Sequence, residues 1–358
     1  MNVAHGSRRR IARRTGLAAT LGIAAVLLSG CSIDNTVLRF GWPSGVTPQA
    51  EMMRELWTWS VVAALVMGVL VWGLTFWTVV FHRKKKGDPD FPRQTGYNVP
   101  LELLYTAVPF IIIAVLFYFT VVVQNYVNDK EHGEADVVVD VTAYQWNWKF
   151  GYRTIDMGDG TPSYDGLDPD GGPQLGSASD EGDDDHGSSV GPIHGAERGE
   201  LDYLTYNTIE TLGSSEEIPV LVLPTNRRIE FVLASADVVH SFWVPEFLFK
   251  RDVMPNPEAN RSDFSFQISE IEEEGAFVGR CAEMCGTYHS MMNFEVRAVS
   301  PERFAEYIEL RKPTVDGGQG LSNAQALEAI GEEPLSTSTV PFNTQREAQT
   351  AIPFRSGN

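Results

Sequence analysis

The sequence predicts a membrane-anchored all-β protein, in which a hairpin of two transmembrane helices precedes a β-domain outside the membrane. Two stretches of 26 and 25 residues carry no charge, and the connection between them is basic. Alternating β-branched residues then begin near Ala135 and continue to about Ser300. The predicted divisions are a signal peptide at 1–30, an external segment at 31–55, transmembrane helices at 56–81 and 103–127 with a cytoplasmic loop at 82–102, an external β-domain at 135–300 with an acidic insertion at 156–200, and a C-terminal helix and tail at 301–358.

The N-terminus is typical of an export signal. Five arginines between Arg8 and Arg14 form a basic region, and the apolar run Leu17–Leu28 that follows is too short to span a membrane convincingly. The small residues before Cys31 resemble the lipobox of bacterial lipoproteins, which implies a cleaved signal and a lipid on Cys31. The alternative is a free cysteine at the end of an uncleaved anchor. A mature chain that mass spectrometry finds unmodified and beginning at Met1 would exclude the lipoprotein.

The two uncharged stretches, Leu56–Phe81 and Leu103–Val127, are the predicted transmembrane helices. At about 1.5 Å per residue, each can cross a hydrocarbon core of about 30 Å. The connection between them is rich in lysine and arginine, so the positive-inside rule places it in the cytoplasm. Both flanking regions are therefore expected on the outer face of the plasma membrane, where exported cysteines meet oxidising conditions.

Five alternating segments predict the strands of a small β-sandwich or barrel. They are Asp136–Tyr144, Ile218–Pro224, Arg228–Ala234, Phe264–Ser269 and Met292–Val299. A short helix is predicted from Pro301 to Lys312, because proline suits a first helical turn. The segment from Asp156 to Glu200 has twelve acidic residues and one basic residue, so it is predicted to be a solvated insertion rather than part of the core. It lacks the closing glutamate of an EF-hand calcium loop.

The formal net charge of −19 restricts the partners that the chain can bind. Nucleic-acid binding requires clustered lysine and arginine on one face, so no nucleic-acid partner is expected. An acidic surface instead suits a basic protein partner or simple solubility.

The stretch "GRCAEMCGTYHSMM", Gly279–Met292, contains four soft or borderline metal ligands. They are Cys281, Cys285, His289 and Met292. Spacing alone leaves a disulfide, a zinc site and a copper site open. A second imidazole is available from His240, which follows a β-branched run and precedes a proline, so it is expected at a strand end.

"CAEMCGTYHSMM" together with "ADVVHSFWVP" resembles the binuclear copper site, CuA, of cytochrome c oxidase subunit II. The aromatic run "YQWNWKFGY" is similar to the family's first external strand, and "PLELLYTAVPF" to the start of its second span. The resemblance covers about Glu51 to Ser300 and leaves out the lipobox, the acidic insertion and the tail. It implies a cupredoxin-like Greek-key β-barrel that holds two copper ions. The implied copper ligands are His240, Cys281, the backbone carbonyl of Glu283, Cys285, His289 and Met292.

The resemblance implies three further roles. The carboxylate of Glu283 would bind a magnesium ion at the interface with subunit I. Trp146 matches the surface tryptophan that receives electrons, although packing in a strand would also explain it and Tyr144 or Trp148 could share the role. Glu102, at the cytoplasmic end of the second span, matches the entrance of a proton path, and the alternative is a simple interfacial anchor.

The chain would then be the subunit of a haem-copper terminal oxidase that first accepts electrons. The predicted spans contain no histidine to ligate haem, so oxygen reduction and the associated proton pumping would require subunit I, accompanied by subunit III. The donor would be a cytochrome c or a membrane-bound c-type cytochrome, including one within a bc complex. Quinol oxidase subunits II lack these ligands, and nitrous oxide reductase is a larger soluble chain. The third alternative is an exported lipoprotein with a Cys281–Cys285 disulfide.

Overall fold

The computed structural model describes residues 39–91, 94, 96–130, 133–158, 163–168, 201, 203–214, 216–313 and 318–341. The described residues from Trp42 onward belong to one compact unit. Cys31 and most of the acidic insertion lie outside the described residues, so the predictions made for them stay predictions.

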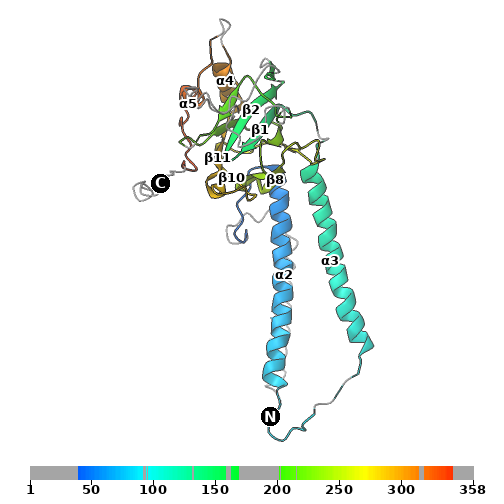
Figure 1. Ribbon diagram of the computed structural model, residues 1–358. Coiled ribbons are helices and arrows are strands. Elements are labelled where there is room, and N and C mark those ends of the chain that lie inside the picture. Colours follow the sequence, from blue (N-terminus) through cyan, green and yellow to red (C-terminus); the bar gives the residue numbers. More distant parts are fainter. Residues whose placement is uncertain are drawn as a thin grey trace, which may run out of the picture. The chain divides into compact units, whose positions relative to one another are not determined.

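Two long helices precede the β-domain (Figure 1). They are α2, Pro48–Phe81, and α3, Val99–Asn128. Each begins with a side-chain cap, because Thr47 accepts a hydrogen bond from Ala50 N and Asn98 accepts one from Leu101 N. Their mean hydropathies of 2.1 and 2.6, with almost no burial along the apolar window, make both of them candidate membrane spans by length and composition. Helix α2 begins eight residues before the predicted span, because the span was drawn from the uncharged stretch alone. The first two turns of the helix carry charged residues and start from the cap at Thr47.

The β-domain consists of two sheets. The first has the order β3-β2-β1-β6-β9 with β4 also paired to β2, and the second has the order β5-β11-β10-β7-β8. Strands β1 and β6 pair in parallel, as do β5 and β11, and the other pairs are antiparallel. The strand bounds are β1 Val137–Tyr144, β2 Asn147–Ile155, β3 Tyr164–Asp165, β4 Glu210–Leu212, β5 Val220–Pro224, β6 Ile229–Ser235, β7 His240–Val244, β8 Phe249–Val253, β9 Ser265–Ile268, β10 Gly275–Cys281 and β11 Asn293–Val299.

The core between the sheets is largely aromatic. Phe242 of β7 stacks on Phe294 of β11 with ring centroids 4.7 Å apart, and it also lies 5.3 Å from Phe231 of the other sheet. Trp148 of β2 packs edge-on against Phe294 at 5.2 Å. Such ring pairs add to the burial of their area and fix how the two sheets face each other. Two apolar helices followed by a β-rich domain confirm the predicted fold class.

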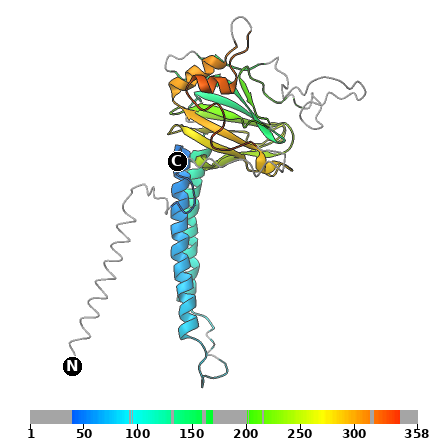
Figure 2. The same ribbon diagram turned by 90° about the vertical axis from the view of Figure 1, so that its left-hand side faces the viewer.

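The C-terminal segment packs on the β-domain (Figure 2). Helix α4, Pro301–Arg311, confirms the helix predicted there and is capped by Ser300. It buries Phe304 and Tyr307 against Tyr152 of β2. The tail also contains helix α5, Asn323–Ala329, which begins with a capping box and was not predicted.

Part of the predicted acidic insertion belongs to the first sheet. Tyr164 and Asp165 form β3 and pair with Thr154 and Ile155 of β2, and Met157 is buried. The boundary drawn at Asp156 therefore takes in sheet residues, because a two-residue strand is too short to show a period of two in the sequence.

Candidate metal centre

The metal centre lies where β7, β10 and the loop after β10 meet. His240 is the first residue of β7, and Cys281 is the last residue of β10. The β-branched residues before His240 form a turn, so the histidine begins a strand and does not follow one. The two strands are antiparallel and pair Cys281 with Phe242, so residues 41 positions apart in sequence become neighbours. The loop then presents Cys285, and the short 3₁₀ helix η3, His289–Met291, ends at Met292.

The structure brings together all six groups that the family resemblance implied as copper ligands. The Sγ atoms of Cys281 and Cys285 are 3.8 Å apart, and both thiols are free. His240 Nδ1 lies 3.8 Å from Cys281 Sγ, and His289 Nδ1 lies 3.5 Å from Cys285 Sγ. Met292 Sδ is 3.8 Å from Cys285 Sγ, and the carbonyl oxygen of Glu283 is 3.2 Å from Cys281 Sγ.

The chemistry of this donor set fits copper. The imidazole of His240 is fully buried, and Cys281, Cys285 and Met292 are buried, so these four donors face one another instead of water. His289 is partly exposed. Metal–thiolate bonds of about 2.3 Å can bridge sulfur atoms at this separation. Two cysteines and two histidines would also satisfy zinc, but the thioether and the carbonyl exceed the four ligands of a closed zinc site.

The two thiols share a proton unequally. The hydrogen bond between the two sulfur atoms lowers the pKa of Cys281, against its burial, and raises the pKa of Cys285. Cys281 is therefore the thiol that loses its proton more readily. Binding of a metal as a thiolate ligand requires both protons to leave.

Asp237 contacts one of the candidate donors and was not singled out from the sequence. Its Oδ1 accepts a hydrogen bond from His240 Nε2 at 2.8 Å, which leaves Nδ1 free to bind a metal. Burial lowers the pKa of His240, but Asp237 and Cys281 outweigh it and the net shift is upward. The sequence does contain a signal for this contact, because an acidic residue, Asp237, stands three residues before the histidine in "ADVVHS".

The turn between β1 and β2 holds the loop that carries Cys285. Gln145 Nε2 donates to the Cys285 carbonyl at 2.5 Å, and Trp146 Nε1 donates to the same oxygen at 3.1 Å. Gly286 follows with φ of +119°, and a Cβ atom there would meet both donor side chains at 3.0 and 3.1 Å. The aromatic run assigned to the first strand thus spans this turn and β2.

The remaining candidates lie in different surroundings. The side chain of Glu283 is exposed, while its carbonyl faces Cys281. Glu102 is in the first turn of α3, where its Oε1 accepts a hydrogen bond from Asn98 N at 2.9 Å. It therefore closes the helix cap and makes no contact with the metal centre.

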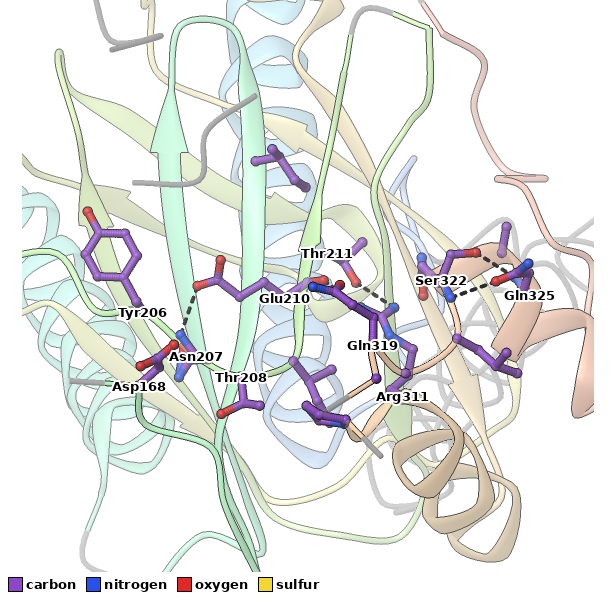
Figure 3. Close-up of a pocket in the computed structure, with 18 of the residues that line it drawn as sticks. Asp168, Tyr206, Asn207, Thr208, Glu210, Thr211, Arg311, Gln319, Ser322 and Gln325 are labelled. Carbon is purple, nitrogen blue, oxygen red and sulfur yellow. Dashed lines mark hydrogen bonds between the residues drawn. The ribbon is translucent and has the colours of Figure 1, made fainter. Parts of the chain in front are cut away.

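A cavity of about 720 Å³ lies away from the metal centre (Figure 3). Residues of β4 and of the connection between α4 and α5 line it, and none of them is a metal-centre donor. Arg311 donates hydrogen bonds to Thr211 Oγ1 at 3.3 Å and to the Glu210 carbonyl at 2.5 Å. Its guanidinium therefore connects α4 to β4.

Fold and site together define a membrane-anchored protein whose β-domain carries a buried thiolate, imidazole and thioether centre. A sequence model described as "Cytochrome C oxidase subunit II, periplasmic domain" matches residues 204–299. The chain is 66% identical over 352 residues to the probable cytochrome c oxidase subunit 2 of Nocardia farcinica, covering 97% of this chain and 92% of that protein. It is 55% identical over 342 residues to cytochrome c oxidase subunit 2 of Mycobacterium tuberculosis, with 95% and 92% covered. The chain belongs to the cytochrome c oxidase subunit II family, which confirms the resemblance.

One solved structure similar to this chain is the periplasmic domain of subunit II of the cytochrome oxidase of Bradyrhizobium japonicum. It is 24% identical with a TM-score of 0.28, and the match covers 49% of this chain and 94% of that one.

Proposed function

We propose that this chain is the subunit of a haem-copper terminal oxidase that first accepts electrons, and that its metal centre holds two copper ions as CuA. The observation that carries the proposal is the convergence of two cysteines, two histidines, a methionine and a backbone carbonyl on one buried point. When bound, two copper ions would supply a one-electron carrier in which the odd electron is shared.

The protein would contribute a set of donors that its own hydrogen bonds position. Cys281 and Cys285 would supply the two thiolates, His240 and His289 one imidazole each, and Met292 and the Glu283 carbonyl two weaker donors. Asp237 orients His240, while Gln145 and Trp146 fix the Cys285 loop from a different strand pair. Little rearrangement of these groups is needed on electron transfer, which keeps the barrier low.

Copper loading of the purified chain tests the proposal. We expect two copper ions per chain and an intense purple colour. In the oxidase complex we also expect one magnesium ion, and a Glu283→Ala variant should lose this magnesium ion. One zinc ion with no colour would favour a structural zinc site. A copper-free, colourless chain after loading under reducing conditions would point to the disulfide-bonded lipoprotein instead.

Trp146 is the proposed point at which electrons arrive. Tyr144 and Trp148 are buried, whereas Trp146 is partly exposed and its indole contacts the Cys285 carbonyl directly. A Trp146→Phe variant is expected to slow electron transfer from the donor cytochrome by about tenfold or more, equivalent to roughly 1.4 kcal/mol in the barrier. It should still bind two copper ions, because Gln145 continues to hold the Cys285 carbonyl. Stopped-flow reduction of the centre measures the rate. A Tyr144→Phe variant is the control. Equal electron-transfer rates in the two variants would contradict the proposal that electrons enter at Trp146.

The proposed partners are oxidase subunits I and III and a cytochrome c, either soluble or membrane-bound and part of a bc complex. The apolar side chains of α2 and α3 are largely exposed in the isolated chain, as expected for helices that contact lipid and other subunits. The copper domain would lie on the outer face of the plasma membrane. Oxygen would be reduced to water in subunit I, coupled to proton pumping.

Glu102 is proposed to stand at the entrance of a proton path on the cytoplasmic side. Its contact with Asn98 N also makes it a helix-capping residue, so the two roles need separating. Glutamine keeps the oxygen that accepts this hydrogen bond but cannot carry a proton. We expect a Glu102→Gln oxidase to be stably assembled and slower in turnover and proton uptake, measured in liposomes. Full turnover with normal proton uptake would leave only the capping role.

A further inference from the structure

A second, small apolar cluster lies beside the metal centre and apart from the main core. Its buried members are Tyr144, Leu201, Leu204 and Ala236, with Tyr203 and Tyr206 packed against them. Two of these residues directly precede groups that the metal centre uses. Tyr144 precedes the turn with Gln145 and Trp146, and Ala236 precedes Asp237.

Tyr203 connects this cluster to the end of β6. Its hydroxyl group donates to the backbone carbonyl of Ser235 at 2.6 Å. Ser235 is fully buried and begins a tight turn, in which its Oγ accepts from Asp237 N at 3.2 Å and donates to the Val238 carbonyl at 2.5 Å. The tyrosine therefore holds the point at which the strand ends and the turn begins.

The carboxylate of Asp237 projects from this turn and joins both sides of the metal centre. Its Oδ1 accepts from His240 Nε2 at 2.8 Å and from Val238 N at 2.6 Å. Its Oδ2 accepts from Gln145 N at 2.6 Å, and the Gln145 side chain holds the Cys285 carbonyl. A shift of the turn would thus move one histidine ligand and one cysteine ligand together.

We propose that Tyr203 is a positioning residue of the metal centre, acting through Ser235 and Asp237 on His240. The hydroxyl group fixes the start of the turn, and the packing of Leu201 and Leu204 on Ala236 keeps it against β1. The inference rests on the proposed copper function.

The test compares Tyr203→Phe with the wild type in the full-length chain within its oxidase complex. Phenylalanine keeps the ring in the cluster and removes only the hydroxyl group that reaches Ser235. Loss of a group that orients a metal ligand lowers metal affinity by about 10- to 100-fold. We expect this range for Asp237→Asn and a smaller loss, about threefold to tenfold, for Tyr203→Phe, measured by competition with a copper chelator. Both variants should also change the histidine hyperfine couplings in the electron paramagnetic resonance spectrum.

Tyr206→Phe is the matched control. Tyr206 belongs to the same cluster, and its ring lies under the Lys149 ammonium at 4.3 Å, a contact that phenylalanine retains. This variant should leave affinity and spectrum unchanged. A Tyr203→Phe chain with wild-type affinity and couplings overturns the inference, even if its thermal stability falls. A wild-type chain that binds no copper overturns the proposed function itself, so the two failures are distinguishable.

Discussion

A Cys285→Ser variant is expected to lose the proposed two-copper centre. Cys285 contacts three of the other donors, since its sulfur lies within 3.8 Å of Cys281 Sγ, His289 Nδ1 and Met292 Sδ. A serine hydroxyl group is a hard, neutral ligand that cannot bridge two soft ions. We expect copper affinity to fall by more than about 100-fold, beyond the loss caused by removing a group that only orients a ligand.

Metal analysis and the visible spectrum of the purified oxidase measure this result. Met284→Leu is the control, because Met284 lies in the same loop but is 73% exposed and contacts none of the donors. It should bind two coppers with the wild-type colour. A Cys285→Ser chain that keeps both coppers and the colour would contradict the proposed bridging role.

A Glu295→Ala variant is expected to destabilise the β-domain strongly. Glu295 is fully buried on β11, and one of its oxygens accepts hydrogen bonds from Ser336 Oγ, Thr337 N, Ser338 N and Ser338 Oγ. Its other oxygen pairs with the buried Arg297 at 2.5 Å. Breaking a buried ion pair by removing one partner costs about 3–5 kcal/mol, because the remaining charge stays buried without an opposite charge beside it.

The free energy of unfolding, from denaturant titration of the full chain, measures the effect. Glu274→Ala is the control, since Glu274 forms only a half-exposed ion pair with Arg303, and its loss should cost less than about 1 kcal/mol. Equal stability of the two variants would show that the buried pair contributes no more than the surface pair. We also expect increased proteolysis near residues 332–340, which Glu295 and Arg297 hold.

Acidification should weaken the same contact. Burial raises the pKa of Glu295, but the donors of Ser338 and the charge of Arg297 outweigh it, so the net pKa is below the ordinary value of 4.5. A depressed pKa contributes stability above the unfolded value of about 4.5, and this stability is lost as the pH falls through the folded pKa. The unfolding midpoint of the wild type should therefore drop at acid pH more steeply than that of Glu295→Ala.

Local patterns were sufficient for much of the fold. The uncharged stretches predicted α2 and α3, and alternation predicted β1, β5, β6, β9 and β11, because these signals depend only on neighbouring residues. Strands β7, β8 and β10 lacked clean alternation and were not predicted. In β10, Gly279 packs its backbone against the Phe294 ring, and a Cβ atom there would come within 2.1 Å of it. Gly279 therefore occupies a buried position of β10 at which a regular apolar–polar alternation would place a large apolar side chain.

By itself, the sequence determined the family and most of the candidate metal donors, because two cysteines, a histidine and a methionine at fixed spacing lie within fourteen residues. Only the tertiary structure decided how His240, Asp237 and the Gln145–Trp146 turn reach that loop. These contacts depend on the pairing of β7 with β10 and of β1 with β6. Pairing between distant strands depends on the packing of the whole core, which no local period encodes. The loop supplies most of the donors, and the two sheets hold them at the distances that a metal needs.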